Sequence, residues 1–154
     1  MKKRKILPKV IYKGLGFPIT LLNVPVKEMF GEEVYDINLN TLQIVVLGLL
    51  AHKLAPLTGD ELRFIRKYCE MTSTSFGTLF GVTHAAVLKW ENEKCRVNPA
   101  TEMCIRLFIL DRLHAKDKEF RSLYHEVSVQ RLAEYTKDIH LPIEINAKEK
   151  LLAA

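Results

Sequence analysis

The stretch from Thr72 to Trp90, TSTSFGTLFGVTHAAVLKW, constrains the fold of this chain more than any other segment. Hydroxyl side chains stand at the start of two short runs, as they do at helix N-termini. We expect one helix over residues 72–80, another over residues 83–92 and a tight turn at residues 81–83. Gly81 stands where the chain needs a positive φ to end the first helix. The pattern therefore predicts two short helices that are held at a fixed angle.

The second of these helices is expected to present two unlike faces. Val82, Val87 and Trp90 should point inward and fix it against the first helix. Gly77 should let the two helices approach closely, since a larger residue would collide there. The opposite face should be small and exposed, and it is formed by His84, Ala85, Leu88 and Lys89. A helix of this kind is suited to the major groove of DNA.

Few side chains on the exposed face can read a base. His84 can donate to a guanine or accept from an adenine or cytosine amino group, and Lys89 can reach a guanine or a phosphate. Ala85 and Ala86 offer only methyl contacts, for example with a thymine methyl group. Simple exposure to solvent is the alternative interpretation of His84 and Lys89.

Phosphate contacts are expected before and after this helix. Thr72 and Ser73 place hydroxyl and free backbone N–H groups at a helix N-terminus, where a phosphate binds favourably. A simple helix cap is the alternative, and it is compatible with phosphate binding. The other candidates for DNA contact are Thr83 at the start of the second helix, and Asn92, Lys94 and Arg96 after its end.

Three short segments carry a resemblance to the Cro/C1-type helix-turn-helix domains: Leu79–Thr83, Ala86-Val87 and Trp90–Asn92. The resemblance implies a five-helix, lambda-repressor-like DNA-binding domain over residues 57–115. It also implies a sequence-specific transcriptional regulator, a repressor, that binds a palindromic operator as a homodimer. A single short helix reads too few base pairs, so two copies about 34 Å apart would be needed on one face of the DNA.

The same resemblance implies which residues support the reader helix. Arg66 of the first helix of the domain should pair with Glu91 and brace the reader helix. Gly81 and Trp90 should complete this support, through the turn and through packing. Side chains of Arg66 and Glu91 more than about 6 Å apart would contradict the pairing, because charges so separated near a surface interact weakly.

The remaining segments predict a mainly α fold with a small N-terminal β element. Apolar residues with a helical spacing, from Leu42 to Leu50, predict a buried helix over residues 40–53. Thr58 and Glu61 form a capping box, and Asn98-Pro99 is a cap followed by proline at the first helical position. The other expected elements are strands at 10–12, 17–26, 34–37 and 140–145, helices at 58–70, 98–114 and 117–137, and frayed last residues. The expected domains are residues 1–56, residues 57–115 and, with a C-terminal helix, residues 116–154.

A second, more specific pattern combines the N-terminal strands, the helix over residues 40–53 and the sequence LTGDELRFIR at residues 57–66. Together they resemble the MqsA/YgiT-type antitoxin regulators, in which the segment before the helix-turn-helix binds zinc through two CxxC pairs. Here Lys27–Gly31, KEMFG, stands where C-x-x-C-G would be expected, and the first pair is missing too. Because a structural zinc site needs thiolates, we predict no zinc and no other cofactor. The resemblance implies a small toxin protein as a partner, but the missing cysteines weaken that inference, since the zinc module is the part that faces the toxin.

The charge and the cysteine content are compatible with a DNA-binding regulator, but they exclude few other classes of protein. The net charge is +5 with a pI near 9.1, which fits a nucleic-acid partner. The basic arm at residues 2–5, KKRK, could lie along phosphates, or it could be a solvated tip. The three cysteines, Cys69, Cys95 and Cys104, form no CxxC pair, and their number and spacing suit a reducing cytosol.

Enzymatic and membrane functions find no support in the sequence. No HExxH, GxSxG, phosphate-binding loop or dinucleotide fingerprint occurs, so we expect no catalytic residue and no enzyme. The longest apolar stretch, residues 42–51, falls far short of the ~20 residues that span a bilayer, and no signal peptide is expected. We expect a bacterial cytoplasmic protein that is nucleoid-associated when bound to DNA. The alternative function is a protein-binding antitoxin or adaptor whose main role is to sequester a toxin.

Overall fold

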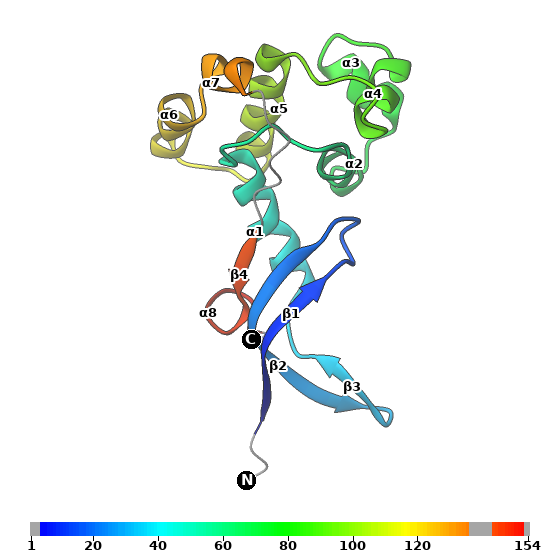
Figure 1. The fold of residues 1–154 in the computed structure, drawn as a ribbon, viewed down its shortest axis with the longest axis vertical. Coiled ribbons are helices and arrows are strands. Elements are labelled where there is room, and N and C mark those ends of the chain that lie inside the picture. Colours follow the sequence, from blue (N-terminus) through cyan, green and yellow to red (C-terminus); the bar gives the residue numbers. More distant parts are fainter. Residues whose placement is uncertain (1–3, 136–142, 153–154) are drawn as a thin grey trace. The chain divides into compact units, whose positions relative to one another are not determined.

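The computed structural model describes residues 4–135 and 143–152. The described chain is mainly α-helical with a small sheet, as the sequence predicts (Figure 1). In chain order the elements are β1 (Lys5–Tyr12), β2 (Ile19–Met29), β3 (Glu32–Tyr35), α1 (Leu39–Ala51), α2 (Gly59–Tyr68), α3 (Ser73–Leu79), α4 (His84–Glu91), α5 (Pro99–Arg112), α6 (Asp117–Glu126), α7 (Val129–Glu134), β4 (Glu144–Asn146) and α8 (Ala147–Lys150).

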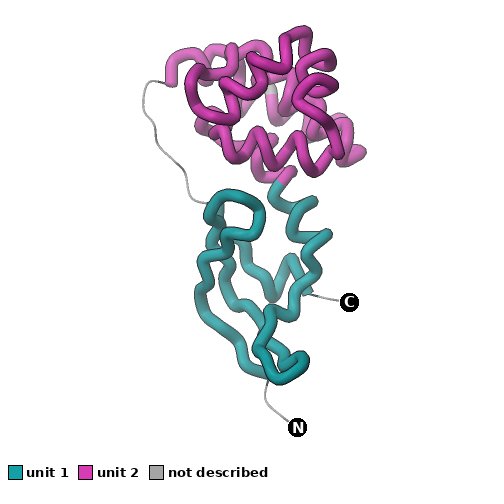
Figure 2. Tube along the Cα trace, turned by 90° about the vertical axis from the view of Figure 1, so that its right-hand side faces the viewer, with its two compact units in different colours: residues 1–46, 142–154 teal, residues 47–141 magenta. Residues whose placement is uncertain are grey.

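The chain forms two compact units, shown in different colours in Figure 2. We call residues 1–46 with 142–154 the sheet unit, and residues 47–141 the helical unit. The boundary falls inside α1, whereas the sequence suggested domains that begin at residues 57 and 116. The C-terminal segment therefore belongs to the same unit as the first strands.

The sheet unit is organised around β2. β1 pairs with β2 antiparallel from Lys5 opposite Val26 to Tyr12 opposite Ile19. On the other side of β2, β3 pairs antiparallel with its second half and β4 pairs parallel with its first half. Alternate residues at the start of β2 point to opposite faces, which places the fully buried Ile19 and Leu21 in the core.

The last described residues, up to Leu152, are packed and not frayed, which corrects the sequence-based expectation for them, while residues 153–154 lie outside the described part. Leu151 is fully buried, and its carbonyl accepts a hydrogen bond from the Asn38 amide at 3.0 Å. Leu152 forms an isolated antiparallel bridge with Ile37. The strand expected over residues 140–145 is described from residue 144 onward, and residues 140–142 lie outside the described part. Local sequence did not reveal this return because its partners are over 100 residues away.

Helices of the helical unit begin with the caps that the sequence predicts. The capping box of Thr58 and Glu61 is present at the start of α2. Asn98 caps α5 with Pro99 in the first turn. The range 57–115 contains four helices, α2 to α5, so the expected number of five is wrong for that range.

The predicted single helix over residues 117–137 is also wrong up to residue 135, and residues 136–137 lie outside the described part. α6 ends at Glu126 and α7 begins at Val129, because Ser128 adopts a positive φ of 45° and caps α7. Val127 at this corner is fully buried, as is Leu123 before it. The break lets both helices bury apolar residues, an advantage that comes from tertiary packing and not from helix propensity.

A buried charged cluster holds the end of α1, and the sequence did not reveal it. The Arg106 side chain is completely buried and donates to the carbonyls of Leu50, Ala51, Lys53 and Ala55, and to the Glu102 carboxylate at 3.0 Å. A cation at a helix C-terminus satisfies the orphan carbonyls and the helix dipole. Beside it, buried Lys53 and Glu61 form an ion pair at 2.7 Å. This cluster joins the end of α1 to α2 and α5.

In the described part of the chain, no helix combines the length and the apolar character needed to cross a membrane.

Candidate nucleic-acid interface

The turn between α3 and α4 has the geometry that the sequence predicts. Thr72 caps α3 and Thr83 caps α4, each accepting from a backbone N–H at 3.1 Å. Gly81 adopts a φ of +72°. A Cβ on Gly77 would lie 2.6 Å from the Val82 carbonyl oxygen, so the close approach is between α3 and the chain that enters α4. Figure 1 shows the two short helices side by side.

The structure places the expected residues on opposite sides of α4. Val87 and Trp90 are buried, 1% and 7% exposed. Val82, expected to point inward, is only half-buried, because it lies in the turn before the helix. The four residues of the expected reading face are all exposed: His84, Ala85, Leu88 and Lys89. α4 therefore has a solvent face with one cation, one imidazole and small or apolar groups.

The predicted ion pair between Arg66 and Glu91 is confirmed. The Arg66 Nε and Nη2 atoms donate to the two carboxylate oxygens of Glu91 at 2.5 and 3.1 Å. Glu91 is 4% exposed, so this two-point contact lies largely out of water, where a charge-assisted pair gives the firmest orientation. The pair fixes the last turn of α4 to α2.

Arg63 is a supporting residue that sequence reasoning missed. Its Nε lies 3.7 Å from the Glu91 carboxylate, and its Nη2 donates to the Glu91 carbonyl and to Asn92 Oδ1 at 3.4 Å each. The signal was available, because Arg63 stands three residues before Arg66 and so shares a face of α2. Asn92, a predicted DNA contact, is thus already turned toward α2.

At the N-terminus of α3, only some of the groups that were expected to bind a phosphate are available for it. The Thr72 hydroxyl accepts from the Ser75 amide and also donates to the Ser75 hydroxyl at 3.0 Å. Ser73 is half-buried. The first backbone N–H groups of the helix, and not these hydroxyls, are the donors that a phosphate would meet.

Arg96 does not lie free beside α4. Its guanidinium donates to the Tyr135 carbonyl at the end of α7 at 3.0 Å. Both residues line a surface hollow of about 620 Å³ that also includes Trp90 and Cys95. In this structure Arg96 therefore connects the loop before α5 to α7, while Lys94 remains exposed.

The charge around α4 is modest. Within residues 72–92 the only charged residues are Lys89 and Glu91, and Glu91 is paired. Within the described part of the chain, Lys67, Lys89 and Lys94 have no carboxylate within 4 Å, and all three are exposed. These three lysines are therefore available to pair with a phosphate.

The described residues show no group of three or more His, Cys, Asp or Glu side chains placed to hold a metal ion. Burial raises the pKa of the Cys69 thiol, while the nearby Arg112 opposes this shift. Cys95 and Cys104 are exposed. The absence of zinc stays a prediction from the missing cysteines.

No family model, no curated protein and no solved structure matches this chain. The two family resemblances therefore depend only on the residues quoted for them.

Proposed function

We propose that the chain is a sequence-specific DNA-binding transcriptional regulator whose α4 enters the major groove, with α2–α5 acting as a lambda-repressor-like helix-turn-helix domain. The observation that carries the proposal is that α4 has two unlike faces, one exposed and one buried. Its exposed face is small enough for close approach to base edges, while Val87, Trp90 and Glu91 anchor the other side. A reading helix needs both properties, because base contacts discriminate only when the helix is held in a fixed position.

The proposed regulator acts as a two-fold dimer on a palindromic operator. The face of α4 offers only His84 and Lys89 as hydrogen-bonding groups for bases. Each good side-chain contact to a base discriminates by about 1–3 kcal/mol, so one copy would select its site weakly. Two copies double the contacts, with a half-site spacing of about 34 Å or a multiple of it.

In vitro selection of bound DNA tests this proposal. We expect the wild-type protein to enrich a palindrome, and His84→Ala and Lys89→Ala each to reduce preference for it by roughly tenfold or more. The matched controls are His125→Ala and Lys118→Ala, both exposed on α6. Unchanged binding of the selected operator by both α4 variants would refute the assignment of α4 as the reader. Failure to enrich any sequence would refute the proposed function itself.

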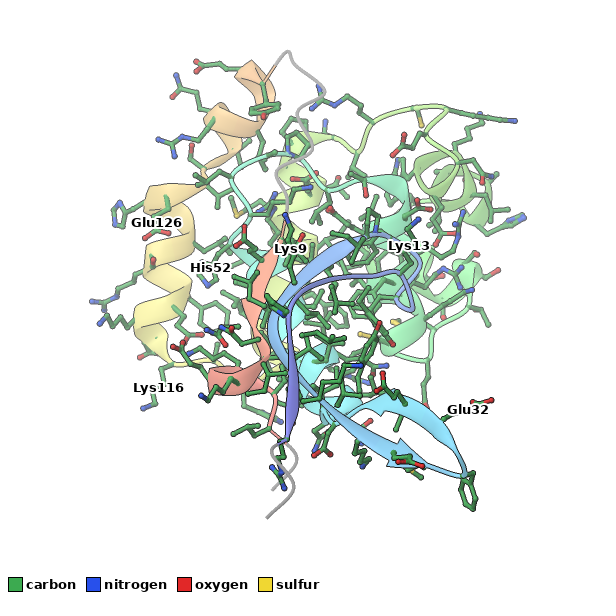
Figure 3. All side chains as sticks on the ribbon, turned by 60° about the horizontal axis from the view of Figure 1, so that its bottom comes forward. Lys9, Lys13, Glu32, His52, Lys116 and Glu126 are labelled. Atoms are coloured by element: carbon green, nitrogen blue, oxygen red, sulfur yellow. The ribbon has the colours of Figure 1, made fainter. Side chains whose placement is uncertain are left out.

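One observation favours a protein partner as a second candidate function. Phe30, between β2 and β3, is 100% exposed and Met29 beside it is 43% exposed. Glu28 and Glu32 flank them, and in the described structure neither has a basic group within 4 Å; Figure 3 shows Glu32 near the end of this hairpin. An apolar tip with acidic flanks fits a pocket with a basic rim.

The second candidate is an antitoxin or adaptor that sequesters a small toxin through this hairpin. It is compatible with DNA binding, since such antitoxins repress their own promoters. The test is co-expression with a growth-inhibiting protein encoded beside this gene, followed by co-purification. Phe30→Ser should abolish rescue and co-purification while Lys89→Ala leaves both intact. Rescue that survives Phe30→Ser would remove the hairpin from the interface.

A further inference from the structure

The first 27 residues carry seven lysines and arginines and no acidic residue, and the first acid is Glu28. Two of these lysines, Lys9 within β1 and Lys13 directly after its last residue, are four residues apart. In an extended chain, residues separated by an even number lie on the same side, and Val10 and Tyr12, which alternate with these lysines, are half-buried on the other side. Lys5 lies on the side of half-buried Leu7, because the alternation is interrupted at Pro8, which has no partner in the register with β2. Lys9 and Lys13 thus extend a row of cations that begins at Arg4 and Lys5.

The middle and end of this row are available to a ligand. Arg4, Lys9 and Lys13 are exposed, and among the described residues none has a carboxylate within 4 Å. Lys5 differs, because its ammonium contacts the Glu33 carboxylate at 2.8 Å. Figure 3 shows Lys9 on β1 and Lys13 in the turn that follows it.

β1 is an edge of the described sheet, since its described pairing is with β2 alone. Glu144 limits the cationic surface on the side away from this edge. It lies on β4 opposite Thr20, which in turn lies opposite Ile11 of β1. Two strand spacings, about 10 Å, separate Glu144 from β1. The cationic surface is therefore the β1 edge and not the whole sheet.

We propose that this edge, formed by Arg4, Lys9 and Lys13, binds the phosphate backbone of the same duplex that α4 reads. Charge complementarity carries the choice of partner. Four residues of extended chain separate Lys9 from Lys13 by about 13 Å, so each ammonium would meet a different phosphate in a duplex with one charge per about 1.7 Å of axis. The inference rests on the proposed function, because that function supplies the duplex.

The edge also compensates for the modest charge of the reading helix. Residues 72–92 have a net charge of zero, so α4 gains little affinity from phosphates. Because the β1 edge is covalently joined to α4, a contact that it makes with the same DNA is intramolecular and needs little affinity of its own. The edge should therefore add affinity for any sequence, while α4 supplies the selectivity.

The experiment compares Lys9→Gln/Lys13→Gln with a matched control, Lys116→Gln/Lys118→Gln, whose lysines are exposed at the start of α6. Fluorescence anisotropy measures the affinity for the selected operator and for a scrambled duplex at several salt concentrations. We expect the β1 variant to lose about 1.8 from the slope of log K against log salt, since each phosphate contact contributes about 0.9. Between about 50 and 200 mM salt this makes the wild type lose about 12-fold more affinity than the variant.

The β1 variant should weaken binding to both duplexes by the same factor and leave their ratio unchanged. His84→Ala should do the opposite, by lowering the ratio with little change in slope. An unchanged slope in the β1 variant, with the ratio intact, would overturn the edge site and leave the proposed function standing. A wild-type ratio of one would refute the proposed function, while the slope on the scrambled duplex would still test the edge.

Two further measurements separate the other roles that edge lysines can have. Light scattering would show self-association of the variant if the lysines only prevent edge-to-edge pairing. Sedimentation with vesicles containing phosphatidylserine would show whether the row binds an anionic lipid surface instead. Either effect with an unchanged DNA salt slope overturns the proposal.

Discussion

Phe30 occupies a backbone conformation that suits few side chains. Its φ is +51° and that of Gly31 is +81°, and the two residues form the whole loop between paired Met29 and Glu32. Positive φ at both central residues is typical of a type I′ hairpin turn, for which Asn-Gly is the favoured pair. Phe30 is also completely exposed, so the ring gains nothing from burial. A residue that is unfavourable in two ways is expected where a partner provides compensation.

Phe30→Asn should stabilise the protein by up to about 1 kcal/mol, because asparagine enters the left-handed region at lower cost. Urea unfolding followed by circular dichroism measures the change. Phe30→Ala is the control, since it removes the ring and keeps the backbone strain, and its stability should match that of the wild type. An equal gain from both variants would show that the exposed ring, and not the backbone, is the unfavourable element.

Arg106 and Glu102 form a buried charged pair on which the stability of the fold depends. Burial raises the pKa of Glu102, although the attraction of Arg106 and a hydrogen bond from the Leu57 amide oppose this shift. Burial likewise lowers the pKa of Arg106. Each charge therefore depends on the other, and removing one partner leaves an uncompensated buried group.

Arg106→Met should cost about 3–5 kcal/mol at neutral pH, since it leaves Glu102 charged and several carbonyls without a donor. The loss should shrink as pH falls. A carboxyl whose pKa is raised in the folded state contributes no penalty below its unfolded pKa, about 4.3, and the penalty grows as pH rises above it. Urea unfolding at pH 4 and pH 7 measures this difference, with exposed Arg121→Met as the control. A loss that is independent of pH would contradict the role given to Glu102.

The contact between the start of α2 and the end of α4 decides how firmly α4, the proposed reading helix, is held. A Cβ on Gly59 would lie 2.3 Å from the Glu91 carbonyl oxygen, closer than any real contact permits. The Gly59 amide also donates to Glu93 at 3.1 Å. The Arg66–Glu91 pair therefore acts beside a backbone contact that only glycine allows.

Two glycine-to-alanine substitutions should have opposite signs. Gly59→Ala must move backbone at the α2–α4 contact, so we expect a loss of about 1–3 kcal/mol. Gly48→Ala lies inside α1, where the nearest atom to the new Cβ is a Leu113 methyl at 3.9 Å. There a gain of about 0.5–1 kcal/mol is expected, because alanine favours the helix. Thermal unfolding of both variants measures these changes. A gain from Gly59→Ala would mean that α4 is not held tightly against α2.

The elements show which kind of information the sequence carries. The starts of α2, α3, α4 and α5 were predicted because each has a capping side chain next to it in the chain: Thr58, Thr72, Thr83 and Asn98. The pairing of Arg66 with Glu91 was also predicted, from the family resemblance. The break at Ser128 and the buried Arg106 were missed, because each depends on partners that only the tertiary fold brings close. Arg63 was missed although its spacing from Arg66 already placed it on the same face of α2.

At the scale of the whole molecule, the chain is divided into two compact units. The sheet unit contains both the start and the end of the described chain, with β4 and α8 against β2. Each unit has its own buried apolar residues, such as Leu21 and Leu151 in the sheet unit and Phe76 and Ile109 in the helical unit. A unit with its own core can lose stability by itself.

Leu151 and Leu152 give a matched pair that tests this division. Leu151 is completely buried and Leu152 is 51% exposed, although they are adjacent in the sequence. Leu151→Ala should destabilise the sheet unit by about 2–5 kcal/mol, the cost of a cavity in a core, whereas Leu152→Ala should change it by less than about 0.5 kcal/mol. Amide hydrogen exchange followed by mass spectrometry assigns the effect to a unit. Exchange in peptides of β2 should accelerate in Leu151→Ala, while exchange in α3 and α4 stays at the wild-type rate. If exchange in α4 accelerated equally, the two units would unfold as one, and α4, the proposed reading helix, would depend on the C-terminal return of the chain.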